Sequence, residues 1–191
     1  MANSSNEKSV HLKTNNFQRV RELSRKQQGV LSLALLERMK PNYQLFGWGG
    51  GGGRGGGVGW AGGGGGGGWG GGGGRDFDMY GVYPAIYFCT GLLTYINGEL
   101  SEDEYDSVAI AKISQGCIVH LIEYQAGETE LDNESIREHE LMAAEMSVLT
   151  ELLDWLSTTR LKDLDLKAIR TKALDIVFAD GVTNIGIELE G

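Results

Sequence analysis

Cysteine and proline are scarce in this chain of 191 residues, which holds two of each. Cys89 and Cys117 lie in apolar stretches without a repeated spacing, so they predict buried free thiols and exclude a disulfide framework. We expect no signal peptide, because the first apolar run comes late, at residues 30–36, inside a charged helical pattern. The longest uncharged run, residues 79–98, is too polar to favour a membrane span. These absences fit a reducing compartment.

Catalytic motifs are also missing. A glycine-rich stretch contains G-x-G-x-x-G, but no predicted strand precedes it, and no Gly-Lys-Ser or Gly-Lys-Thr occurs, so neither nucleotide-binding loop is indicated. The Glu-x-x-His pairs of di-iron bundles are absent, since Ile136 and Cys117 stand three residues before His139 and His120. We therefore predict no enzymatic activity, no cofactor and no small-molecule substrate.

A metal site at Cys117 and His120 is an alternative that the sequence allows. Cys117 and His120 form a C-x-x-H pair, which one turn of helix could direct at a metal, and Cys89 could supply a third ligand. A single pair of this kind is more often a core thiol beside a histidine. We expect no metal here.

The chain's most unusual feature is a tract at residues 47–74, in which 22 of 28 residues are glycine. The intervals between its Trp and Arg residues, including the Arg just beyond it, are all multiples of three, the period of a polyproline-II-type helix. This register predicts a polyglycine-II-like segment that packs between subunits through Trp48, Arg54, Trp60, Trp69 and Arg75. A flexible linker is the alternative, because glycine loses more backbone entropy on ordering than any other residue.

Charge divides the chain at the end of this tract. Residues 1–75 carry ten Lys or Arg against three Asp or Glu, whereas residues 76–191 carry seven against 23. We predict a basic N-terminal arm and helix at 1–46, the glycine-rich segment at 47–74 and an acidic helical body with a C-terminal tail at 75–191. The arm could dock on the body of another copy, or on nucleic acid, which the acidic body makes the less favoured partner.

Hydrophobic periodicity predicts a mainly α fold, a bundle of about four helices plus an N-terminal helix. Asn15 with Gln18 and Ser101 with Glu104 resemble capping boxes, and Pro41 is expected to end the first helix. The second helix is apolar nearly all round, which predicts a central buried position. The expected helices cover about 16–39, 84–98, 101–124, 133–157 and 162–178.

Two points of local structure stay open. The β-branched run near Cys117 allows a strand at 117–124. Asp180-Gly181 is compatible with a type I′ hairpin or with a helix followed by a C′ glycine, of which we favour the helix. Residues 182–190 are then an extended tail, whose alternating apolar residues could add a strand to a partner's sheet.

The glycine runs punctuated by Trp, at 49–53, 55–57, 62–68 and 70–74, resemble the glycine-rich modules of tailed-bacteriophage fibre-tip adhesins. That resemblance implies polyglycine-II packing but transfers no functional residues. Together with the charge division, it predicts a non-enzymatic structural subunit of a homo-oligomeric particle, plausibly a phage head, neck or tail protein, located in a virion or the cytoplasm. Its partners would be further copies of itself and other particle proteins, with no membrane. The alternative is a nucleic-acid or partner-binding module with a flexible Gly/Trp/Arg arm.

Overall fold

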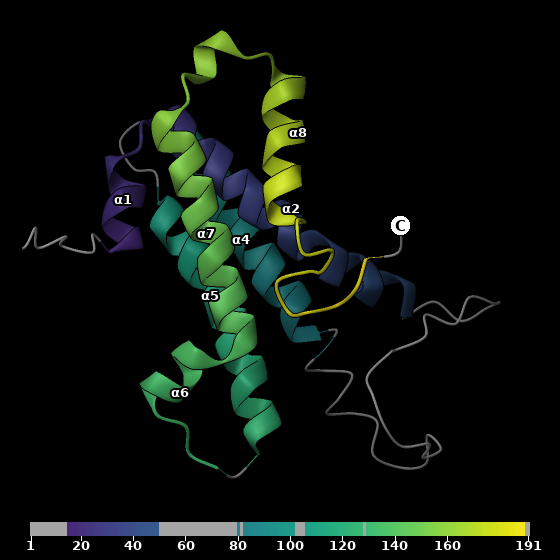
Figure 1. The fold of residues 1–191 in the computed structure, drawn as a ribbon. Helices are drawn as coiled ribbons and strands as arrows, with labels where there is room; N and C mark the ends of the chain where they lie inside the picture. Colours follow the sequence, from purple (N-terminus) through teal and green to yellow (C-terminus); the bar gives the residue numbers. More distant parts are fainter. Residues whose placement is uncertain (1–14, 50–79, 81, 102–105, 128, 190–191) are drawn as a thin grey trace, which may run out of the picture.

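The computed structural model describes residues 15–49, 80, 82–101, 106–127 and 129–189. Within these residues the protein is built from helices, as the sequence predicts, with one isolated antiparallel β-bridge (Figure 1). The α-helices are α1 (Asn16–Glu22), α2 (Arg25–Gly49), α4 (Tyr83–Leu100), α5 (Ser107–Ala126), α6 (Asn133–Glu138), α7 (Glu140–Thr158) and α8 (Leu166–Val177). A 3-10 turn, η2 (Leu161–Asp163), precedes α8.

The first predicted helix is divided in two and extends further than expected. Asn15 caps α1, where its side chain accepts from the Phe17 N–H, which confirms the predicted start. The chain breaks at Ser24, whose N–H and hydroxyl both bond to the Gln27 side chain. The expectation that Pro41 ends the helix is wrong, because α2 continues through it to Gly49. Proline cannot donate the helical hydrogen bond at this position, and the apolar burial of the neighbouring Met39 favours keeping the helix packed against the body.

The second predicted helix, α4, is not buried as expected. Only its proline and three of its small residues are buried, and its large apolar residues face solvent on one side. The predicted start of the next helix is also wrong, because Ser101 closes α4 and Asp106 caps α5. Residues 117–124 are helical throughout α5, which excludes the strand alternative.

The predicted long helix over 133–157 is confirmed at its start and interrupted near its middle. The Asp132 carboxylate accepts from the Ser135 N–H and caps α6. His139 adopts an extended backbone conformation, ends α6 and caps α7 by accepting from the Leu141 N–H. The chain changes direction at His139, between α6 and α7 (Figure 1), and the ring nitrogen of this residue satisfies one of the first N–H groups of α7.

The core joins helices from both halves of the chain. One cluster contains Val20 of α1, Leu31 and Leu35 of α2, Ile110 of α5, four leucines of α7 (Leu149, Leu152, Leu153 and Leu156) and Ile176 of α8. A second, smaller cluster joins Cys117, Ile118, Leu121, Ile122 and Met142 to Ile185 of the C-terminal segment. Helices α1 and α2, which lie in the predicted N-terminal arm and helix (1–46), therefore share a core with the later helices.

The C-terminal segment is not the extended tail that we expected. Gly181 adopts a positive φ of 72° shortly after α8, as a residue following a helix often does. The chain then turns back on itself, with Thr183 N–H bonded to Ile187 O and a bridge between Val182 and Glu188. Residues 183–185 are buried against the body. A strand that adds to a partner's sheet would first have to leave this position.

Most of the predicted glycine-rich segment lies outside the described residues. Its first three residues, 47–49, form the last turn of α2, so the predicted extended conformation is wrong at that point.

Candidate interaction surface

An apolar stripe follows the outer side of α4. It contains Val82, Ile86, Cys89, Leu93, Ile96 and Leu100, which we call the α4 seam, and its intervals are 4, 3, 4, 3 and 4. Ile86 is 52% exposed, Leu93 61%, Ile96 42% and Leu100 80%, and Cys89 is also exposed. A 3-4 alternation is the spacing by which one helix packs along another.

The opposite side of α4 fixes the helix to the body. Its buried residues are Pro84, Gly91 and Gly98, and α2 and α5 pack against the helix. A Cβ on Gly91 would lie 2.9 Å from Leu36 Cδ2, so any larger residue here would require the Leu36 side chain to move. At about 100° per residue, the five seam residues within α4 span an arc of about 80°, centred opposite Gly91. The seam therefore points away from the body.

Charge is nearly absent from α4. Glu99 is its single Asp, Glu, Lys or Arg residue, although the whole chain has a net charge of −9. An exposed helix in a globular protein normally carries charged residues on its outer face. The α4 seam is therefore an exposed apolar surface of the kind that marks an interaction site.

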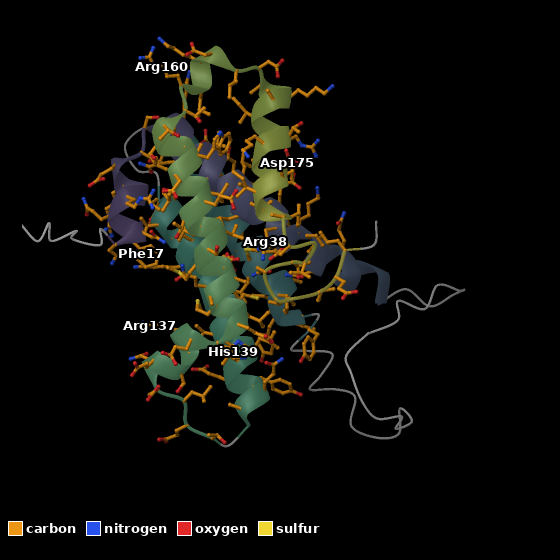
Figure 2. The ribbon with its side chains drawn as sticks, viewed as in Figure 1. Phe17, Arg38, Arg137, His139, Arg160 and Asp175 are labelled. Carbon is orange, nitrogen blue, oxygen red and sulfur yellow. The ribbon has the colours of Figure 1, made fainter. Side chains whose placement is uncertain are left out.

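A buried ion network lies at the centre of the body and holds the C-terminal segment in place. Figure 2 places Arg38 near the middle of the molecule, whereas Arg137 and Arg160 lie toward its ends. Arg38 is 1% exposed and pairs with Glu145 of α7, itself 2% exposed, at 3.2 Å, and with Asp180 at 2.7 Å.

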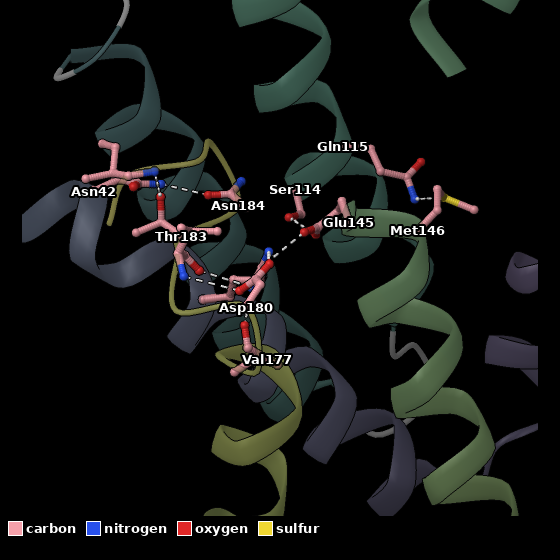
Figure 3. A network of polar contacts seen from close by, with 12 residues as sticks. Asn42, Ser114, Gln115, Glu145, Met146, Val177, Asp180, Thr183 and Asn184 are labelled. Carbon is pink, nitrogen blue, oxygen red and sulfur yellow. Dashed lines mark hydrogen bonds and ion pairs between the residues drawn. The ribbon is translucent and has the colours of Figure 1, made fainter. Parts of the chain in front are cut away.

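The remaining hydrogen bonds of this network reach the backbone and a neighbouring helix. The Arg38 guanidinium donates to the carbonyls of Val177 and Val182, and the Ser114 hydroxyl of α5 donates to Glu145. Figure 3 shows Glu145 facing Ser114, with Val177 and Asp180 on the other side. We call these residues the Arg38 network. They link four helices to the start of the C-terminal segment.

The pKa values in the Arg38 network follow from burial and pairing. Burial raises the pKa of Glu145, and the Ser114 hydroxyl and the Arg38 charge oppose that rise. Partial burial raises the pKa of Asp180, but the hydrogen bonds from Arg38 and from the Val182 N–H, together with the Arg38 charge, outweigh it and leave the pKa below its ordinary value. For Arg38, burial lowers the pKa, and the bond to Asp180 together with the charge of Glu145 leaves it raised. The Arg38 guanidinium therefore stays charged.

Cys117, His120 and Cys89 are not assembled as a metal site. Burial raises the pKa of the Cys117 thiol to about 12, which disfavours the thiolate that binds metals. The His120 ring stacks against Tyr83, with ring centroids 4.4 Å apart. Cys89 lies on the exposed α4 seam, so its predicted burial is wrong. Across the described ranges, no three His, Cys, Asp or Glu residues are grouped to hold a metal.

A surface hollow lies between α1 and the start of α5. It has a volume of about 390 Å³, and Arg21 and Lys112 contribute positive charge to it. The buried Ser107 hydroxyl in its wall donates to Gln28, so this group is already paired.

For the helices that the structure describes, none is both long and apolar enough to cross a membrane.

The predicted subunit-packing residues are not brought together in the described part of the chain. The backbone of Trp48 lies in the last turn of α2, whereas Arg54, Trp60, Trp69 and Arg75 fall outside the described residues. Both the packing role and the nucleic-acid alternative rest on these residues and stay predictions.

The sequence analysis missed both the α4 seam and the Arg38 network. A signal for the first was the 3-4 alternation of residues 82–100, which the prediction of an all-round apolar, buried helix did not separate from the other apolar residues. A signal for the second was the position of Arg38, which follows Leu31 and Ala34 at helical spacing and so belongs to the buried side of α2.

The chain resembles proteins from several bacteria. It is 32% identical over 114 residues to the uncharacterized protein YjaG of Escherichia coli K12, which covers 59% of this chain and 56% of that protein. YjaG of Salmonella typhimurium is 28% identical over 117 residues, covering 60% of this chain and 57% of that one. The matches thus span little more than half the length of these curated relatives.

A solved structure shares the fold. The crystal structure of a DUF416 family protein from Shewanella baltica OS155 matches with a TM-score of 0.67 and 21% identity, covering 93% of this chain and 100% of that one.

A family model described as "Protein of unknown function (DUF416)" matches residues 15–48 and 73–188, on either side of most of the glycine tract. These matches overturn the resemblance to phage fibre-tip modules, which rested on that tract alone, and none of them indicates a polyglycine-II module. The chain belongs to the DUF416 family.

Proposed function

We propose that this protein is a non-enzymatic assembly module that works as a homo-oligomer, and that the α4 seam is the contact between copies. The observation that carries the proposal is an exposed apolar stripe with 3-4 spacing on a helix whose other side is tightly packed. Such a helix is apolar on both sides because it has two packing partners, one in its own chain and one outside it.

The energetic argument for this role rests on hydration. Each Å² of apolar surface removed from water contributes about 25 cal/mol, and the four most exposed seam residues are all Leu or Ile. Their spacing allows knobs-into-holes packing along the whole helix. Because α4 carries one charged residue, two copies can approach here without bringing charged groups into an apolar contact.

The proposal is tested by the mass of the native assembly, measured by light scattering or sedimentation. Leu93→Lys places a charge in the middle of the α4 seam, while Leu166→Lys, on an 85% exposed residue of α8, is the matched control. We expect the wild type and the control to self-associate and Leu93→Lys to weaken association by about 30-fold or more, as for a residue at the centre of an interface.

Two results would contradict the proposal. One is a wild-type protein that stays monomeric at high concentration and low salt. The other is a Leu93→Lys variant that assembles as the wild type does while both are folded by circular dichroism.

A further inference from the structure

We propose that residues 181–189, which we call the C-terminal hairpin, open as one unit about Gly181 while the helices of the body stay folded. The hairpin is the yellow loop that follows α8 in Figure 1, and its Ile185 belongs to the smaller core cluster together with Cys117. Opening exposes Cys117, which is buried in the closed form. The hairpin is thus a conformational switch that controls access to this cluster, and it does not involve the α4 seam.

The backbone hydrogen bonds of the C-terminal hairpin make it a self-contained unit. The Thr183 N–H donates to the Ile187 carbonyl at 2.9 Å. The Leu189 N–H donates to the Gly181 carbonyl at 3.0 Å. Among the hydrogen bonds of the described residues, none joins a backbone N–H of the hairpin to α2, α5 or α7. The hairpin therefore keeps its own backbone bonds when it leaves the body.

Side chains of α2 supply polar links between the hairpin and the body. At the base of the hairpin, the Arg38 guanidinium donates to the Val182 carbonyl at 3.1 Å. Further along, Asn42 Nδ2 donates to Asn184 Oδ1 at 2.7 Å (Figure 3), and the Asn184 amide adjoins the Cys117 thiol. Asn42 Oδ1 is buried without a hydrogen-bond partner in the part of the chain that the structure describes. Water can reach this oxygen in the open form, which favours opening.

Apolar contact also holds the hairpin, and it is concentrated in one residue. Ile185 is 4% exposed, whereas Ile187 is only partly buried against the same cluster. The helices share the larger core cluster, which contains no residue of the hairpin. Opening therefore exposes much less apolar surface than global unfolding does, and it requires less free energy.

Gly181 is placed to act as the hinge. Its φ is 72°, and beyond its chain neighbours no atom lies within 4 Å of the position that a Cβ would take. Glycine adopts positive and negative φ about equally readily, so this position can absorb a large rotation. The Arg38–Asp180 pair lies on the body side of the hinge and is kept, whereas the bond from Arg38 to the Val182 carbonyl is broken.

The test follows labelling of the Cys117 thiol in full-length protein that carries Cys89→Ser, because the chain has two cysteines. Folded protein is mixed with the thiol reagent DTNB at several urea concentrations below the unfolding transition. The urea dependence of the labelling rate is compared with that of global unfolding. Ile185→Ala weakens the contact of the hairpin, and the matched control Leu152→Ala weakens the body at a side chain that is 0% exposed.

We expect the slope of labelling against urea to be less than about a third of the slope for global unfolding, because opening exposes little surface. Ile185→Ala should raise the labelling rate about 30-fold or more, as expected for truncation of a buried isoleucine. Leu152→Ala destabilises only the globally unfolding body, so its labelling rate should stay within about threefold of the parent rate.

Three results would overturn the inference. The first is a urea slope equal to that of global unfolding, and the second is an unchanged labelling rate in Ile185→Ala. The third is an equal rise in the labelling rate of both variants. The urea slope is measured on the parent protein, so it decides the question even where a variant does not fold.

Discussion

We predict that removing the Arg38 charge strongly lowers the free energy of unfolding, and that a second substitution at Glu145 restores part of the loss. Replacing Arg38 with Met removes the cation that faces the buried Glu145 carboxylate. Removing one partner of a buried ion pair costs about 3–5 kcal/mol, because the other charge is left uncompensated. The carbonyls of Val177 and Val182 also lose their donor, at about 1–3 kcal/mol each where water cannot reach them. The total is a large part of the 5–15 kcal/mol that typically holds a domain together.

A second substitution separates these contributions. In Arg38→Met/Glu145→Met the buried carboxylate is gone too, so the double variant should recover about 3–5 kcal/mol relative to the single one. It should remain less stable than the wild type, because the two backbone carbonyls are still without their donor. Urea unfolding followed by circular dichroism gives the free energy of unfolding of each protein.

The reasoning is refuted if the free energy of unfolding of Arg38→Met lies within about 1 kcal/mol of the wild-type value, since a difference that small is expected at an exposed position. It is equally refuted if the double variant is no more stable than the single variant. If Arg38→Met does not fold at all, a folded double variant still supports the assignment of the loss to Glu145.

Further substitutions at Asp180, Gly186 and Gly181 test the C-terminal segment. The pKa of Asp180 is lowered in the folded protein, so its ionisation stabilises the fold above its unfolded pKa of about 3.9, and this stabilisation is lost as the pH falls through the folded pKa. The difference in urea midpoint between the wild type and Asp180→Asn should therefore shrink below about pH 4. A difference that stays constant with pH would contradict this prediction. Gly186→Ala should lose about 1–3 kcal/mol, because φ is 77° and the new Cβ would lie 2.9 Å from Leu141 Cδ2. Gly181→Ala, with φ of 72° and open space around it, should lose less; equal losses in thermal melts would exclude a role for the Leu141 contact.

Local signals predicted the helices where a polar side chain satisfies the first backbone N–H groups. Asn15 caps its helix as expected, and Asp132 caps the helix predicted to begin at about residue 133, because this bond is made within a few residues of sequence. Pro41 and His139 were misjudged for the opposite reason. Tertiary packing keeps α2 helical around Pro41, and the His139 ring cap interrupts a segment whose apolar pattern is continuous. Hydrophobic periodicity alone indicates neither the packing around Pro41 nor the cap at His139.

The candidate site could be predicted only in part. The apolar residues of α4 were visible in the sequence, but periodicity does not tell whether an all-round apolar helix is covered by its own chain or by another. The Arg38 network was harder still, since Glu145 and Asp180 lie more than 100 residues further along. Pairing over that distance depends on the whole fold, which one sequence without relatives does not specify.

The position of Arg38 affects how the chain folds during its synthesis on the ribosome. The acceptors of its guanidinium lie 107 to 144 positions downstream, so α2 is synthesised long before they exist. Until residue 182 emerges, the arginine must remain hydrated, and the apolar side of α2 cannot close over it. Nascent chains that stop before residue 177 should therefore remain open to proteases, and completion of the body should wait until residue 182 has been synthesised.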